Sequence, residues 1–99
     1  MLKRDASCPL CGARLSAEQV LANCDDVVDL AQGVLACHCP FCQGYFEVRT
    51  SNGGLEIGYL RHGRFDTVVV LPDATGLQTT IGRDGISLKL NQSAWHFEN

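Results

Sequence analysis

The chain has 99 residues, six of them cysteine, with a formal net charge of −3 and an apolar fraction of 45%. This length suits one domain, and the apolar fraction is too high for a disordered chain. The acidic balance argues against a general attraction to the phosphate backbone of nucleic acids. No stretch approaches the roughly 20 apolar residues that a membrane-spanning helix needs, so we expect no membrane partner.

The first residues predict the compartment. Lys3 and Arg4 supply positive charge, but no apolar run follows them, so we expect no signal peptide and a cytoplasmic location. In a reducing compartment, clustered cysteines favour metal binding over disulfides. A secreted framework of disulfides is the alternative that six cysteines in a short chain leave open.

Two short motifs hold four of the cysteines. Residues 8–12 read CPLCG and residues 39–44 read CPFCQG. Each motif predicts a tight turn that directs two thiolates at one point, and four thiolates form a tetrahedral site for a soft divalent metal. We therefore predict one structural Zn²⁺ and no catalytic residues, because four protein ligands leave no position for water. The predicted ligands are Cys8, Cys11, Cys39 and Cys42.

A helix is expected between the two motifs. Ser16 and Gln19 form a capping-box pattern, and Gly33 is a suitable stop. Apolar residues then recur at helical spacing, which predicts a helix over residues 17–31; they are Val20, Leu21, Cys24, Val27, Val28 and Ala31. A weaker alternative is a short helix that ends near Cys24, followed by strands at 27–30 and 34–37 around Gly33.

The rest of the chain predicts antiparallel strands joined by short turns. Turn sequences at 51–54, 61–64 and 84–85 separate segments in which apolar and polar residues alternate. The expected strands cover residues 34–38, 45–50, 55–59, 65–71, 86–90 and 94–97. The expected fold class is α+β, with a metal-binding segment over 1–50 and a β-meander over 51–99 that packs on it as one compact unit.

Residues 8–50 resemble a zinc ribbon. The two C-P-x-C motifs, the intervening insertion and the strand YFEVR carry the resemblance, which covers less than half of the chain. It implies the same four cysteine ligands, and it leaves the function open because ribbons serve many roles. Gln43 departs from the pattern, since ribbons usually have glycine there, and a left-handed backbone would strain it. Residues 51–99 resemble no family.

The remaining cysteines and histidines have several interpretations. Cys24 is expected to be a buried, inert thiol on the apolar helix face. As an alternative, Cys37 or His38 replaces one of the four predicted ligands. A redox pair between Cys24 and Cys37 is the least favoured interpretation. His62 and His96 are expected to be surface or packed side chains.

Two charged segments mimic functional motifs. Residues 25–29 read DDVVD, like a metal–diphosphate motif, but 99 residues are too few for the helical cavity that this chemistry needs. We expect them to form a polar helix face. Residues 61–64 read RHGR, and a solvated hairpin turn is favoured there over a phosphate site.

Three functional hypotheses follow. The leading one is a non-enzymatic protein-interaction or adaptor module that binds a protein partner or itself through its sheet. The alternative is a nucleic-acid-binding regulator with a small basic and aromatic face, in which Tyr45 and Phe46 would point to opposite sides of a strand; the candidate residues are Arg14, Tyr45, Phe46 and Arg49. A rubredoxin-like electron carrier with iron in the same site is third.

Overall fold

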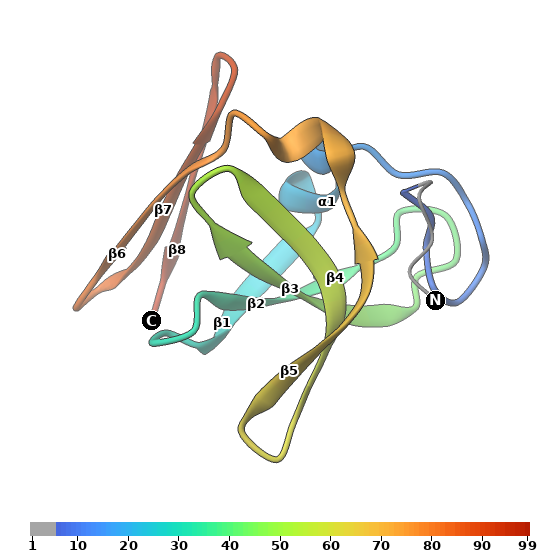
Figure 1. The fold of residues 1–99 in the computed structure, drawn as a ribbon, viewed down its shortest axis with the longest axis horizontal. Helices are drawn as coiled ribbons and strands as arrows, with labels where there is room; N and C mark the ends of the chain where they lie inside the picture. The colour runs from blue at the N-terminus through green and yellow to red at the C-terminus, as the bar shows by residue number, and fades with distance from the viewer. Residues whose placement is uncertain (1–5) are drawn as a thin grey trace.

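The computed structural model describes residues 6–99. In this part of the chain, one short helix and one 3₁₀ turn accompany two antiparallel sheets (Figure 1). The elements in chain order are α1 (Ala17–Ala22), β1 (Cys24–Asp29), β2 (Val34–His38), β3 (Tyr45–Ser51), β4 (Gly54–Arg61), β5 (Arg64–Val70), η1 (Pro72–Ala74), β6 (Gln78–Gly82), β7 (Gly85–Leu90) and β8 (Ser93–Glu98).

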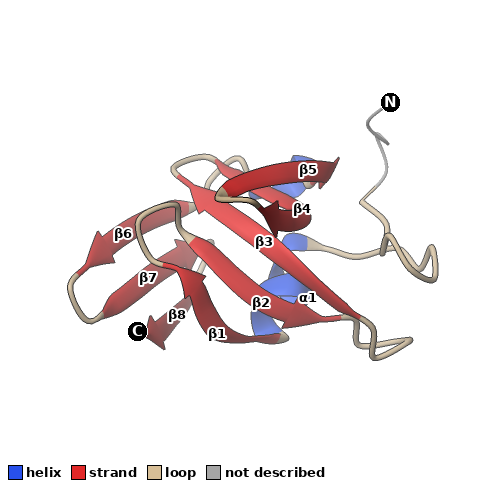
Figure 2. Ribbon diagram, turned by 90° about the horizontal axis from the view of Figure 1, so that it is seen from below, coloured by secondary structure: helices blue, strands red, loops and turns tan. Residues whose placement is uncertain are grey.

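Both sheets are simple meanders. Strands β1 to β5 pair in chain order in the first sheet, and β6 to β8 do the same in the second. The loops that precede α1 and join β2 to β3 lie together at one end of the molecule, and the three-stranded sheet lies at the other (Figures 1 and 2). The cysteine motifs are therefore held at one end of the five-stranded sheet.

One apolar core joins the elements. Buried residues from α1, both sheets and the connection through η1 belong to a single cluster. Its largest fully buried members include Phe46, Leu35, Leu55, Ile57 and Ile86. Because these side chains come from alternate positions of strands in both sheets, the alternation of apolar and polar residues in the sequence is what closes the core.

The prediction of an α+β fold with an inserted helix over 17–31 is wrong. The helix ends at Ala22, and Cys24–Asp29 is a strand that pairs with β2 around a turn containing Gly33. Gly33 has a φ of 70°, and it closes the turn through an N–H bond to Leu30 O at 3.2 Å. The helical spacing does not hold in the structure, because β1 pairs irregularly with β2 and leaves Val28 40% exposed. The β-branched residues Val27 and Val28 favour extended backbone.

The start of the helix is as predicted. The Ser16 hydroxyl accepts a hydrogen bond from Gln19 N at 3.1 Å, and the Gln19 side chain accepts one from Ser16 N at 2.9 Å. Asp73 from η1 accepts a further bond from Ala17 N at 3.0 Å. These contacts satisfy amides of the first turn that have no partner within the helix, and they tie α1 to the connection between the two sheets.

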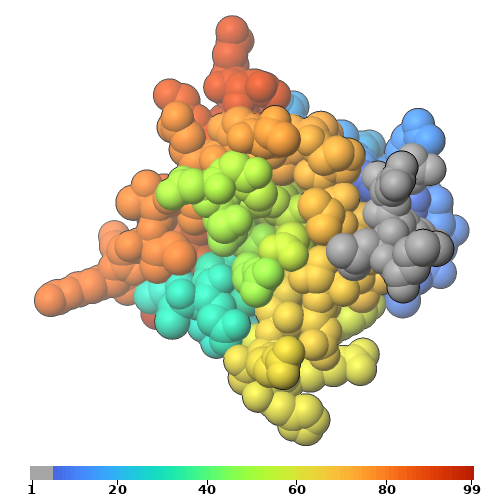
Figure 3. Space-filling view, in the orientation of Figure 1, coloured from blue at the N-terminus to red at the C-terminus, as the bar shows by residue number. Residues whose placement is uncertain are grey.

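The strands after the second motif agree with the sequence pattern. Structure adds one strand that was not predicted, Gln78–Gly82, which pairs with β7 across the expected Asp84–Gly85 turn. The expected turn at Arg61–Arg64 joins β4 to β5, with His62 and Gly63 at positive φ. Both turns project from the body of the molecule in the space-filling view, one in orange and one in yellow (Figure 3).

No helix within residues 6–99 is long and apolar enough to cross a membrane.

Candidate metal centre

The two cysteine motifs adopt the same backbone conformation. In the first Cys loop, residues 8–13, Gly12 N donates to Cys8 O at 2.9 Å and Cys8 N donates to Ala13 O at 2.8 Å. In the second Cys loop, residues 39–44, the equivalent bonds run from Gln43 N to Cys39 O and from Cys39 N to Gly44 O, both at 2.9 Å. Two segments of different sequence thus form the same turn.

Backbone amides in both loops point at sulfur. Leu10 N donates to Cys8 Sγ at 3.3 Å, and Phe41 N donates to Cys39 Sγ at 3.4 Å. Gly44 N adds a bond to Cys42 Sγ at 3.4 Å. Such amides stabilise negative charge on a thiolate, and they fix the direction in which each sulfur points.

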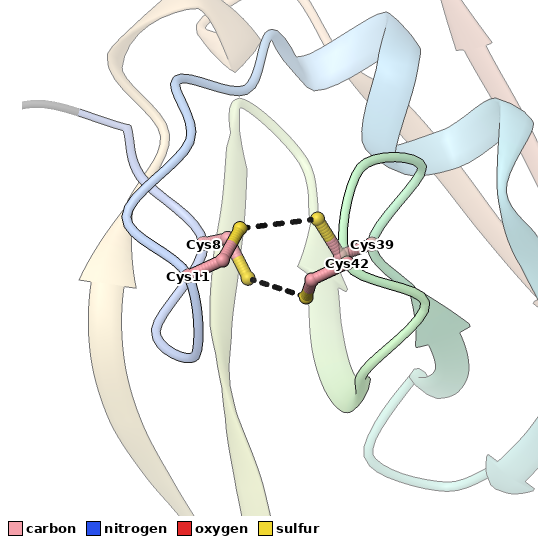
Figure 4. A group of neighbouring side chains, drawn as sticks. All are labelled: Cys8, Cys11, Cys39 and Cys42. Carbon is pink, nitrogen blue, oxygen red and sulfur yellow. Dashed lines mark hydrogen bonds between the residues drawn. The ribbon is translucent and has the colours of Figure 1, made fainter.

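The four sulfurs meet between the loops (Figure 4). Cys8 Sγ lies 3.8 Å from Cys42 Sγ, and Cys11 Sγ lies 3.7 Å from Cys39 Sγ. All four sulfurs lie within 4.8 Å of one another. A tetrahedral zinc ion with Zn–S bonds of about 2.3 Å would place its sulfurs about 3.8 Å apart. The spacing of the side chains therefore fits one tetrahedral metal ion.

The candidate site is half buried. Cys8 and Cys39, the first cysteine of each motif, are 1% and 0% exposed, whereas Cys11 and Cys42 are exposed. Each loop thus contributes one sulfur from the core side and one from the solvent side. A metal ion there would join the two loops and cover the end of the core.

The thiols influence one another's ionisation. The Ala13 amide lowers the pKa of Cys11, but burial and the three neighbouring thiols outweigh it and raise the pKa to about 12. Burial raises the pKa of Cys39, but the Cys42 and Phe41 amides and the neighbouring thiols bring it down to about 7. Four thiolates this close repel one another, so a divalent cation is the group that would let all four ionise.

Gln43 adopts the left-handed backbone that the sequence flagged as a source of strain. Its φ is 63°, close to the 78° of Gly12 at the matching position of the first loop. The second loop therefore keeps the same shape despite the missing glycine. At Gly44, a Cβ would lie 2.2 Å from Cδ1 of the exposed Leu10 side chain, which would have to move aside.

Cys37 and His38 are not part of the cluster. Cys37 forms a disulfide with Cys24, and the two residues face each other across β1 and β2. The expectation that Cys24 is an inert thiol is therefore wrong, and the pairing that the sequence least favoured is the one present. His38 Nδ1 lies 3.1 Å from Asp25 Oδ2 instead. A hairpin around Gly33 was the sequence signal that could have predicted the disulfide, because it brings Cys24 and Cys37 opposite each other.

The residues suggested for a nucleic-acid face differ in their exposure and partners. Tyr45 and Phe46 point to opposite sides of β3 as predicted, and Phe46 is fully buried. Arg49 donates to Glu56 Oε2 at 2.7 Å and lies 5.3 Å from the centre of the Phe65 ring. Arg14 is exposed beside the first Cys loop. Of the two aromatic residues, only Tyr45 is available to an exposed surface.

Large apolar side chains are exposed around the candidate metal centre. Leu10 and Phe41 occupy the third position of each C-P-x-C motif and are 55% and 60% exposed, and Tyr45, just after the second loop, is 52% exposed. We call these three residues the loop patch. Tyr45 also donates through its hydroxyl to the buried Glu47 at 2.5 Å, which anchors its ring at the start of β3.

No protein-family model, curated protein sequence or solved structure matches this chain. The resemblance to zinc ribbons therefore rests on the four-cysteine cluster, and the case for a metal rests on its geometry.

Proposed function

We propose that the chain is a non-enzymatic zinc-binding module in which one Zn²⁺ joins the two Cys loops. The observation that carries this proposal is the spacing of the four sulfurs, which lie within 4.8 Å of one another and match a tetrahedral site. Iron is the competing metal, because four thiolates also suit it and it would support electron transfer. The non-enzymatic role follows from the ligand count, since four cysteines leave no open position for a substrate.

We propose that the end of the molecule that carries the two Cys loops binds a protein partner or a second copy of the chain. The loop patch supports this, because Leu10 and Phe41 are carried outward on the loops that the metal would order. Exposed clusters of large apolar side chains commonly mark interaction surfaces. A regulator that binds nucleic acid has less support, because Phe46 is buried and Arg49 is paired with Glu56.

Metal identity is tested by native mass spectrometry of protein purified without added metal. One zinc per chain supports the proposal, whereas one iron favours the electron carrier and no metal rejects both. Cys11→Ser should lose the metal, because it removes a proposed ligand. Leu10→Ser is its matched control, because it changes the same Cys loop and removes no proposed ligand. The control should keep its metal.

Partner binding is tested by sedimentation over a wide range of protein concentration. Self-association should raise the average mass, and the double variant L10S/F41S should abolish the rise while it keeps the metal. A wild-type protein that stays monomeric rejects the second copy. A partner of another sequence must then bind the wild type and fail to bind L10S/F41S.

The cytoplasmic location expected from the sequence stays a prediction. Four unpaired cysteines fit a reducing compartment, whereas the Cys24–Cys37 disulfide fits an oxidising one. Fractionation of cells that express the full chain would decide between them.

A further inference from the structure

The Cys24–Cys37 disulfide stands between the two Cys loops along the chain. Cys24 begins β1, directly after the helix that follows the first loop. Cys37 is the fourth residue of β2, and Cys39 of the second loop follows it by two positions. The disulfide thus links the segment that leaves one loop to the segment that enters the other.

A backbone contact reinforces this link. His38 N donates to Asn23 O at 3.2 Å, so the residues beside both cysteines are also joined. The two half-cystines differ in access, because Cys37 is 1% exposed whereas Cys24 is partly exposed. An attacking thiol would therefore reach the disulfide from the Cys24 side.

The disulfide shortens the loop that the metal must close. Cys11 and Cys39 are 28 positions apart along the chain. The path through the disulfide covers only the stretch from Cys11 to Cys24 and the step from Cys37 to Cys39. Bringing together the ends of a shorter loop costs less entropy, and halving the loop changes the closure probability by about threefold. Where the pairing of β1 with β2 opens, the oxidised chain should therefore hold its thiols closer to the arrangement that the metal requires.

Resting on the zinc-binding function proposed above, we propose that Cys24–Cys37 is a thiol–disulfide exchange site that controls metal retention. Its co-substrate is a low-molecular-weight thiol. The oxidised form keeps the two Cys loops in place for the ion, and reduction weakens the hold of the four cysteines on it.

The exchange is balanced in two steps. The thiolate of one small thiol attacks Cys24 Sγ, the Cys24–Cys37 bond breaks, and Cys37 leaves as a thiolate that takes a proton from water. A second small thiol then attacks the mixed disulfide, which releases Cys24 as a thiol and forms the disulfide of the small molecule. Two electrons pass from the two small thiols to the protein.

The first experiment measures the exchange itself. Metal-loaded full-length protein is equilibrated in glutathione buffers of graded redox potential, quenched in acid and alkylated, and its thiol pairs are mapped by mass spectrometry. We expect the Cys24–Cys37 pair to open without denaturant. A pair that stays oxidised until the protein is unfolded would overturn the proposal and identify a purely structural cross-link.

The second experiment measures metal retention. A chromogenic chelator competes for zinc with the oxidised protein, the glutathione-reduced protein and the double variant C24S/C37S. We expect the reduced protein and the variant to release zinc at about threefold lower chelator concentration, and only the wild type to respond to glutathione. Equal release from all three forms would overturn the proposal. If the variant fails to fold, the comparison of oxidised with reduced wild type decides.

The two proposals fail in distinguishable ways. A chain that binds no metal in either redox state contradicts the zinc-binding function, whatever the alkylation result. A chain that binds zinc equally in both states retains that function and loses only the redox control.

Discussion

The two ends of the molecule are stabilised by different means. At one end, the Cys loops expose Leu10 and Phe41 to solvent and depend on sulfur: four thiols at the candidate metal centre and a disulfide beside it. At the other end, β6, β7 and β8 have no cysteine, and Ile86, Leu88 and Leu90 are buried in the shared core. The comparison teaches that hydrophobic burial folds the sheets, whereas the Cys loops would be positioned by the disulfide and by a metal ion in the candidate centre. Each variant described below tests either the Cys loops and their sulfur atoms or the sheets and their core.

The largest effect is expected from Cys39→Ser, which removes a buried ligand from the candidate centre. Structural zinc contributes on the order of 10–16 kcal/mol of apparent binding free energy in small peptides, so its loss should disorder both Cys loops. Native mass spectrometry should show no bound zinc, and hydrogen exchange should speed up in the loops more than in β6 to β8. Zinc retained at one ion per chain would mean that Cys39 is not a ligand.

Phe46→Ala tests the contribution of the hydrophobic core. Phe46 is fully buried in the shared core, so the substitution should lower the free energy of unfolding by about 3–5 kcal/mol. Urea unfolding measured with and without a zinc chelator should show the same loss under both conditions. A loss that appears only when zinc is bound would show that the core and the metal centre are not separable.

The variant C24S/C37S removes the disulfide but no proposed ligand. The bond spans 13 positions, and cross-links that close loops of about this length contribute about 3 kcal/mol through the entropy of the unfolded chain. Thermal unfolding in zinc-containing buffer should show this loss. The reduced wild type provides the control, because it lacks the same bond without any substitution and should melt at a similar temperature.

Glu56→Gln tests a charged contact on the five-stranded sheet, away from the sulfur chemistry. Burial raises the pKa of Glu56, but hydrogen bonds from Arg49 and Thr67 and the charge of Arg49 outweigh it, so its pKa lies below the usual 4.5. The ionised group therefore stabilises the fold above that pH, and the contribution fades as the pH falls through the lowered pKa. We expect a loss of about 1–2 kcal/mol at neutral pH.

The control for this pH dependence is the wild type measured in acid. The difference between wild type and Glu56→Gln in urea unfolding should shrink below pH 4.5. A difference that stays constant down to acid pH would mean that the amide disturbs packing rather than removes a charge.

The smallest effect is a gain from Gln43→Gly in the second Cys loop. The left-handed backbone costs a residue with a Cβ about 1–2 kcal/mol, and glycine removes this cost. Part of the gain is offset because glycine gives the unfolded chain more conformational freedom. The net increase in the free energy of unfolding should be about 0.5–1 kcal/mol in zinc-bound protein. Gly12→Ala at the matching position of the first loop is the converse control and should destabilise, since its φ is 78°.

The sequence by itself determined the candidate ligands, because the C-P-x-C motif dictates a local turn whose hydrogen bonds lie within six residues. It also determined the capping box at Ser16 and the hairpin turns at 61–64 and 84–85, since these depend on neighbouring residues alone. Each is a local feature, so no knowledge of distant contacts was needed to predict it.

Only the tertiary structure decided the state of residues 24–37. The apolar positions of residues 24–31 have helical spacing, but the β-branched Val27 and Val28 favour a strand. The strand is the state present because β1 pairs with β2, which is itself paired with β3. That pairing in turn placed Cys24 opposite Cys37 and formed the disulfide. Contacts between residues far apart in the chain resolve such ambiguity, because β-propensity reflects packing against neighbouring strands more than any preference of the backbone itself.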